Sequence, residues 1–193
     1  MMKMKHTVTI YCASASDLAP IYTEAARELG RRLALEHADI VTGAGRTGLM
    51  GAVADAALEA GGRVTGIIPQ FMVERGWHHK GLSELVITPD MHRRKEAMAA
   101  RATATVALPG GIGTFEELME IITWRQLGLF RGNVVIYNVA NYYAPLLSMF
   151  AQAISQGFMR PDHREIFTVA ESIDEVIAAA FAEPSARGFS PKF

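Results

Sequence analysis

Short apolar runs alternate with longer helical patterns along the whole chain, and this alternation limits its fold more than any other feature. The runs are rich in β-branched residues, as strands are, while the segments between them carry the apolar spacing of amphipathic helices. Alternation of this kind favours a parallel sheet with helices on both faces. We therefore expect an α/β, three-layer Rossmann-like fold with a mainly parallel sheet of about seven strands. The expected strands are 7–12, 39–42, 63–68, 84–88, 102–108, 134–138 and 166–169, and the expected helices are 18–36, 48–60, 91–101, 114–127, 143–156 and 173–182.

The length of 193 residues suits one domain of ordinary size. We expect residues 1–183 to form a single Rossmann-like nucleotide-binding domain and residues 184–193 to be a mobile tail. The irregular stretch 69–81 is long for a connection inside a compact α/β domain, so we expect it to be a binding loop.

Charge and cysteine content exclude several classes of protein. Nineteen basic and twenty acidic residues leave a formal charge of −1, so a general nucleic-acid or membrane surface is not expected. No apolar run approaches the ~20 residues needed to span a bilayer. The single cysteine, Cys12, excludes an internal disulfide and suits a reducing compartment, so we expect a cytoplasmic protein. The residues Val8–Tyr11 favour a first strand over a signal peptide.

A first glycine-rich loop follows the second expected strand. Gly43, Gly45 and Gly48 match the pattern G-x-G-x-x-G at the start of a helix, where backbone N–H groups bind anions. A nicotinamide dinucleotide site would also need an acidic residue at the end of the next strand, but that strand ends Gly66–Pro69. An NAD-dependent oxidoreductase is therefore a minor alternative, and glycines that serve only tight packing are another. We expect no cofactor.

A second glycine-rich loop, Pro109–Glu117, has the composition of a phosphate cradle and lacks the lysine of a Walker loop. Thr114 and Glu117 also match a capping box, so a purely structural role for Glu117 stays open. Glu116 and Glu117 lie about 100° apart around a helix and cannot face one ligand. A glycosidase built on these two carboxylates is therefore disfavoured.

A third segment, Met91–Lys95, places one histidine, two arginines and one lysine in the first turn of a helix that Asp90 can cap. The helix dipole disfavours cations at this end, and a bound phosphate would relieve the conflict. A basic turn exposed to solvent is the alternative. The scattered histidines have no metal-ligand spacing, so we expect no metal site.

These segments resemble the LONELY GUY (LOG) family of cytokinin riboside 5′-monophosphate phosphoribohydrolases. The family signatures Pro-Gly-Gly-x-Gly-Thr-x-x-Glu and Met-His-x-Arg-Lys stand here as Pro109–Glu117 and Met91–Lys95. The resemblance runs from about Val8 to about Ala182. Further similar stretches are Gly48–Gly51, Ile122–Gly128, Asn141–Tyr143 and Gly157–Phe158.

The resemblance implies hydrolysis of the N-glycosidic bond of AMP, or of an N6-modified cytokinin-type AMP, to a free base and ribose 5-phosphate. It implies that Arg94 and Glu117 are catalytic and that the protein is a homodimer. A nucleotide-binding regulatory protein without hydrolysis is the alternative function. The residues that it implies for substrate and phosphate binding are Gly45, Gly48, Glu74, Met91, Lys95, Gly111, Gly113 and Thr114.

Two departures from the family pattern lie beside the expected ligand. Ala13 and Ala44 stand where the family usually has glycine, and the added methyl groups can reshape the base or phosphate pocket. The family was earlier labelled as lysine decarboxylases. A pyridoxal phosphate enzyme needs a Schiff-base lysine with an acidic partner for the ring nitrogen, and the sequence identifies neither.

Overall fold

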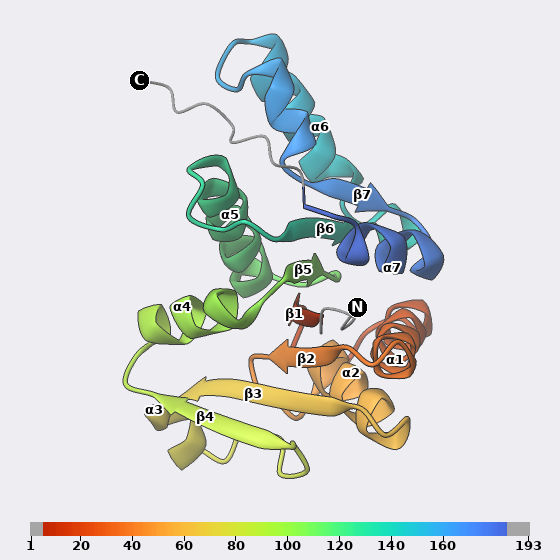
Figure 1. Ribbon diagram of the computed structural model, residues 1–193, viewed down its shortest axis with the longest axis vertical. Helices are drawn as coiled ribbons and strands as arrows, with labels where there is room; N and C mark the ends of the chain where they lie inside the picture. Colours follow the sequence, from red (N-terminus) through yellow and green to blue (C-terminus); the bar gives the residue numbers. More distant parts are fainter. Residues whose placement is uncertain (1–5, 185–193) are drawn as a thin grey trace.

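A computed structural model describes residues 6–184 of the chain. Its seven strands form one sheet in the order β4-β3-β2-β1-β5-β6-β7, and each strand pairs in parallel with its neighbours (Figure 1). The predicted α/β fold and seven-stranded sheet are therefore confirmed. The strands are β1 Thr7–Tyr11, β2 Asp39–Thr42, β3 Arg63–Pro69, β4 Glu84–Thr88, β5 Ala104–Ala107, β6 Asn133–Tyr137 and β7 Thr168–Ala170.

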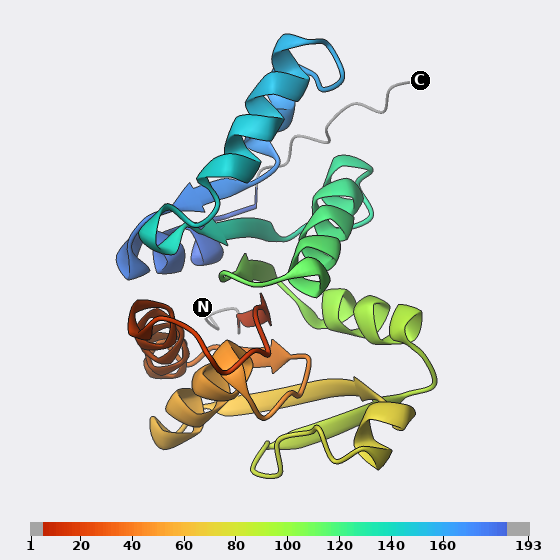
Figure 2. The ribbon, with the colours of Figure 1, turned by 180° about the vertical axis from the view of Figure 1, so that it is seen from behind.

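Helices cover both faces of the sheet, and each face has its own hydrophobic core (Figures 1 and 2). Helices α1, α2 and α7 pack on one face, while α4 and α5 pack on the other together with part of α6. The five inner strands are almost entirely buried, as strands covered on both sides must be, whereas the edge strands β4 and β7 are partly exposed. The helices are α1 Pro20–Leu35, α2 Gly48–Glu59, α3 Gln70–Glu74, α4 Met91–Arg101, α5 Ile112–Gln126, α6 Ala144–Ser155 and α7 Ile173–Phe181, with short 3-10 turns at Val139–Asn141 and Pro161–Glu165.

Local chemistry moves several element bounds from their predicted positions. Helix α1 begins at Pro20 rather than at residue 18, because a residue before proline avoids the helical region and Ala19 is extended (ψ 140°). The stretch 69–81, predicted to be irregular, contains helix α3. Strand β7 begins at Thr168 rather than at residue 166, because the 3-10 turn precedes it. Apart from Pro184, the tail predicted to be mobile lies outside the described residues.

The connections after β1 and β5 meet at the centre of the sheet. These two strands are neighbours, but β1 leads into α1 on one face and β5 leads into α5 on the other. Such a switch point leaves a crevice beyond the carboxyl ends of the strands, where open α/β sheets bind ligands. The two connections touch, since the Ala13 N–H donates to the Pro109 carbonyl at 3.1 Å. The predicted glycine loops therefore lie on this edge.

The helices within residues 6–184 are all too short or too polar to cross a membrane.

Candidate active site

The structure joins the two predicted catalytic residues. Arg94 lies in the first turn of α4, which Asp90 caps by accepting a hydrogen bond from the Arg93 N–H at 2.8 Å. Glu117 lies in α5, and its Oε1 accepts from Arg94 Nη1 at 2.9 Å. Both side chains are buried, with 7% and 10% of their surfaces exposed. A paired, largely dehydrated arginine and carboxylate thus lie beside the carboxyl end of the sheet.

The Arg94 guanidinium also packs against the backbone around it. Its Nε donates to the Ile67 carbonyl of β3 at 3.0 Å. A Cβ atom added at Gly43 would fall 1.9 Å from Arg94 Nη2, far inside van der Waals contact. The Arg94 guanidinium occupies the space that a side chain would need at Gly43, the first glycine of the 43–48 loop. This position therefore requires glycine.

Burial dominates the electrostatics of Glu117. It raises the pKa of this carboxyl above the ordinary value of 4.5, although the charge and hydrogen bond of Arg94 oppose the shift. The negative charge of Glu116 adds to the rise. Burial also raises the pKa of Tyr11 and Cys12, and the Glu117 carboxylate adds to both shifts. The Glu117 carboxyl therefore exchanges its proton nearer to neutral pH than the carboxyl of an exposed glutamate does.

The other cations of the α4 first turn are also paired within the chain. Arg93 contacts Glu96 at 2.6 Å, and the Lys95 ammonium contacts Glu116 and Glu120 of α5. Burial acts to lower the pKa of Lys95, but the two carboxylates outweigh it and the pKa is raised. These carboxylates relieve the conflict between cations and helix dipole. The crowding of charge therefore does not by itself require a ligand.

The amino terminus of α5 presents a run of free backbone donors. Among residues 6–184, the five successive N–H groups from Gly110 to Thr114 donate no hydrogen bond to a protein acceptor. A Cβ atom at Gly111 or Gly113 would meet nothing within 4 Å, so this backbone is open to an approaching group. Successive free donors at the positive end of a helix suit an anion.

The amino terminus of α2, the other predicted cradle, is already occupied by the chain. The N–H groups of Leu49 and Met50 both donate to the Ala13 carbonyl, at 3.0 and 3.2 Å. Gly48 has a left-handed backbone (φ +63°), and a Cβ atom there would lie 2.4 Å from the Ala15 carbonyl oxygen. This loop therefore uses part of its donors to bind the β1–α1 connection, which matches the packing alternative for its glycines.

The capping-box alternative for Glu117 is wrong. Helix α5 begins at Ile112 with Gly111 as its N-cap, so Thr114 lies inside the helix. The Thr114 side chain is buried, and Glu117 turns into the core toward Arg94 rather than back to the helix start. The capping box does not form because the buried Arg94 is a stronger partner for the Glu117 carboxylate than the backbone at the helix start.

Three other predicted residues lie at the edge of this arrangement. Glu74 is exposed at the end of α3 and accepts from Gln70 Nε2 at 3.0 Å, and no described contact joins it to the Arg94–Glu117 pair. Met91 is half-buried at the start of α4. The Gly45 N–H is directed to the Met50 sulfur at 2.9 Å.

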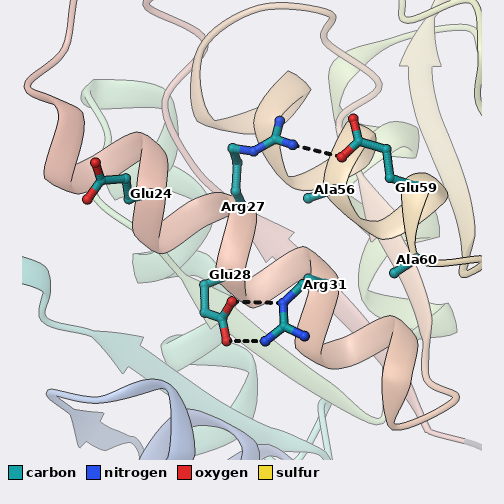
Figure 3. A pocket seen from close by; sticks show the side chains of 7 residues that line it. All are labelled: Glu24, Arg27, Glu28, Arg31, Ala56, Glu59 and Ala60. Atoms are coloured by element: carbon teal, nitrogen blue, oxygen red, sulfur yellow. Dashed lines mark hydrogen bonds and ion pairs between the residues drawn. The ribbon is translucent and has the colours of Figure 1, made fainter.

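A hollow of about 410 Å³ lies away from these residues, between α1 and α2 (Figure 3). Four of its charged groups pair with each other, Arg27 with Glu59 at 2.7 Å and Arg31 with Glu28 at 2.7 Å. Exposed ion pairs of this kind are ordinary surface features. The carboxyl edge of the sheet at the switch point, with the buried Arg94–Glu117 pair and the backbone donors of α5, is the stronger candidate for chemistry.

Sequence reasoning missed several residues that shape the site. Gly43 was noted only as part of a glycine pattern, and no local signal shows that it faces an arginine 51 positions later. Glu120 was missed, although its place one turn after Glu116 was a usable signal. Tyr142 and Tyr143, whose hydroxyls bond the 108–110 backbone, were noted only as a similar stretch. Within residues 6–184, no three His, Cys, Asp or Glu side chains could together hold a metal ion.

Comparison with solved structures supports the architecture. The Moco carrier protein of Chlamydomonas reinhardtii superposes with a TM-score of 0.69 at 22% identity, over 91% of this chain and 94% of that one. The molybdenum cofactor binding protein of Rippkaea orientalis gives 0.67 at 18% identity, over 92% and 95%. At these identities the likeness shows the fold alone.

Sequence relatives are closer. The cytokinin riboside 5′-monophosphate phosphoribohydrolase of Rhodococcoides fascians is 41% identical over 175 residues, which cover 90% of this chain and 88% of that protein. The enzyme of the same name LOG7 from Arabidopsis thaliana is 41% identical over 170 residues, 88% of this chain and 78% of that one. The family model described as "Possible lysine decarboxylase" matches residues 50–180. The chain therefore belongs to the LOG family that this model describes.

Proposed function

We propose that this protein hydrolyses the N-glycosidic bond of a nucleoside 5′-monophosphate, AMP or an N6-modified cytokinin-type AMP, to the free base and ribose 5-phosphate. The observation that carries the proposal is the buried Arg94–Glu117 pair one helical turn beyond a free helix amino terminus. The relatives named as cytokinin riboside 5′-monophosphate phosphoribohydrolases support the substrate class.

The substrate phosphate is assigned to the amino terminus of α5. The free N–H groups from Gly110 to Thr114 include those of the predicted residues Gly111, Gly113 and Thr114. Lys95 and the Gly45–Gly48 loop have protein partners already, so backbone donors supply the principal contacts. Phosphate binding there uses energy remote from the reacting carbon to position the ribose.

Glu117 is placed to act on the ribose. It follows Gly113 by four residues, so the two lie on the same helix face about 6 Å apart along the axis. In the reaction, a water oxygen bonds to C1′ while the bond from C1′ to the base nitrogen breaks. The Glu117 carboxylate accepts the proton of that water and stabilises positive charge on the sugar. The departing base takes up a proton from solvent, and Glu117 returns its proton to solvent before the next turnover.

Arg94 holds Glu117 in this role. It is anchored by the Ile67 carbonyl and confined by Gly43, so its guanidinium fixes the carboxylate orientation. Its charge also limits the rise in the Glu117 pKa that burial causes, which keeps the carboxylate ionised over a wider pH range. Arg94 and Glu117 together therefore form the catalytic pair.

The description "Possible lysine decarboxylase" is a poor guide to this site. Lys95 is the buried lysine of the arrangement, and its raised pKa favours the ammonium form. A lysine that forms a Schiff base must lose its proton and therefore has a lowered pKa. The electrostatics of Lys95 thus favour an ion-pairing role.

We also propose that the protein acts as a cytoplasmic homodimer with α6 in the interface. Helix α6 extends beyond the sheet in both views, and none of its residues is fully buried although most are apolar (Figures 1 and 2). Met149 is 61% exposed and Phe158, just beyond the helix, is 73% exposed. Exposed apolar surface of this kind favours a protein partner. The buried free thiol of Cys12 suits a reducing compartment.

The experiment is incubation of the purified chain with AMP and, separately, with its N6-isopentenyl analogue, followed by chromatography for free base and ribose 5-phosphate. We expect equal amounts of both products from at least one substrate. Tight binding of either nucleotide without base release would instead favour a nucleotide-binding regulatory protein.

A further inference from the structure

Two adjacent tyrosines after β6 hold the loop that precedes α5. The Tyr142 hydroxyl donates to the Gly110 carbonyl at 2.6 Å, and the Tyr143 hydroxyl donates to the Leu108 carbonyl at 2.7 Å. The carbonyl between them, that of Pro109, accepts the Ala13 N–H at 3.1 Å. Three successive carbonyl groups of the loop are therefore fixed from outside it.

These bonds determine where the loop donors point. The peptide bonds of this segment are trans, so each carbonyl and the N–H of the same peptide point in opposite directions. When the Pro109 carbonyl turns toward Ala13, the Gly110 N–H turns away from it. When the Gly110 carbonyl turns toward Tyr142, the Gly111 N–H turns away in the same manner. Both N–H groups belong to the run that lacks protein acceptors within residues 6–184.

The turn that presents the tyrosines is itself constrained. Ala140 and Asn141 have left-handed backbones, with φ +50° and +59°, which non-glycine residues rarely adopt. Asn138 stabilises the turn, because its Oδ1 accepts the Tyr143 N–H at 2.8 Å and its Nδ2 donates to Asn141 at 3.3 Å. Strain of this kind persists where surrounding contacts fix the conformation, and it accumulates at functional sites.

We propose that Tyr142 and Tyr143 are positioning residues for phosphate recognition. The Tyr142 hydroxyl orients the Gly111 N–H toward the substrate phosphate, and the Tyr143 hydroxyl, bonded to the Leu108–Pro109 peptide that has no N–H, fixes the start of the loop. This inference rests on the proposed function, since it takes the phosphate to bind at the amino terminus of α5. The two side chains act through the loop backbone. They set the affinity for the phosphate and leave the chemistry to Arg94 and Glu117.

The first test replaces each hydroxyl by hydrogen. Tyr142→Phe should weaken ribose 5-phosphate binding, measured by titration calorimetry, by about 3- to 10-fold, the range that one neutral hydrogen bond gives. The KM for AMP should rise by the same factor while kcat stays within about twofold, because the lost contact acts on binding. Tyr143→Phe should act in the same direction. Tyr143 is only 1% exposed, so the half-buried Tyr142 carries the test if Tyr143→Phe destabilises the fold.

Tyr22→Phe is the matched control. Tyr22 lies edge-on to Tyr142 with ring centroids 6.0 Å apart, but its hydroxyl has no hydrogen-bond partner in the described part of the chain. It should leave both the affinity and KM unchanged. Equal ribose 5-phosphate affinity in Tyr142→Phe and Tyr22→Phe would overturn the inference, as would a fall in kcat with an unchanged KM.

The two proposals fail separately in this design. Ribose 5-phosphate binding that depends on Tyr142, in a protein that releases no base, would overturn the proposed hydrolysis and keep the positioning role. If the protein releases base but its affinity for ribose 5-phosphate is the same with and without the Tyr142 hydroxyl, only the positioning role is overturned.

Discussion

Arg94 and Glu117 lie 23 residues apart in the sequence, yet their side chains meet at 2.9 Å in the interior. The first turns of α4 and α5 both start beyond the carboxyl ends of strands, which brings the pair to one edge of the sheet. A buried charge pair is costly to desolvate, so it is weak support for stability alone. Its place beside the backbone donors of α5 is what supports the proposed catalytic role.

Gly43→Ala should damage the site while preserving the fold. The new Cβ would lie 1.9 Å from Arg94 Nη2, so the guanidinium must move and Glu117 loses its orientation. A displacement of about 1 Å can reduce a rate on the order of 100-fold, and we expect a loss of that size in kcat/KM for AMP. The control is Gly81→Ala at an exposed glycine before β4, which should change kcat/KM by less than about twofold. Equal activity in the two variants would show that Arg94 tolerates displacement.

The pH dependence should follow the raised pKa of Glu117. Because the carboxylate is the working form, activity is lost as pH falls through that pKa, and the acid limb of kcat/KM should lie above pH 4.5. The negative charge of Glu116 contributes to the rise, so Glu116→Gln should lower the pKa and move the limb to lower pH. Glu96→Gln, at an exposed carboxylate of α4, should leave the limb in place. An upward shift in Glu116→Gln would contradict the assignment.

The fold was largely predictable because it depends on patterns that span whole segments. Apolar runs and helical spacing located every strand, and Asp90 was correctly predicted to cap α4. Bounds shifted where one residue decided them, as at Pro20, or where a 3-10 turn intervened before β7.

The site was less predictable, because its contacts join residues distant in the sequence. The motifs pointed to Arg94 and Glu117, but their mutual distance needed the packing of α4 on the sheet beside α5. Both glycine loops have the composition of an anion cradle. Only the structure shows that the Ala13 carbonyl takes two donors of α2, those of Leu49 and Met50, while the five donors at the start of α5 have no protein partner among residues 6–184.

Ala44→Gly should lower the free energy of unfolding only slightly, whereas replacing a buried alanine by glycine usually lowers it more. Ala44 is fully buried with φ +64°, and this conformation costs an L-residue about 1–2 kcal/mol that glycine avoids. The flexibility of glycine costs roughly 0.5–1 kcal/mol in return. The matched control is Ala54→Gly, an equally buried alanine in α2. Urea unfolding should show that Ala54→Gly lowers the free energy of unfolding by about 1–2 kcal/mol more than Ala44→Gly does. The reverse order would contradict the strain at Ala44.

Met149→Asp should convert the proposed dimer to monomers. A charge at this 61% exposed position of α6 disrupts an apolar interface without entering the core. Leu35→Asp, at a residue of α1 that is 52% exposed, is the control and should leave the dimer intact. Sedimentation velocity of the unmodified chain and both variants measures the change. A monomeric unmodified chain, or a dimer that survives Met149→Asp, would remove α6 from the interface.

The role of Glu117 is tested most directly by the rate of base release from AMP in Glu117→Gln, followed by chromatography. Glutamine keeps the shape of the side chain and removes its charge, so we expect kcat to fall on the order of 100-fold or more with the fold retained. Glu96→Gln, which alters an exposed carboxylate that also pairs with an arginine, should retain full activity. Undiminished base release by a folded Glu117→Gln protein would contradict the account.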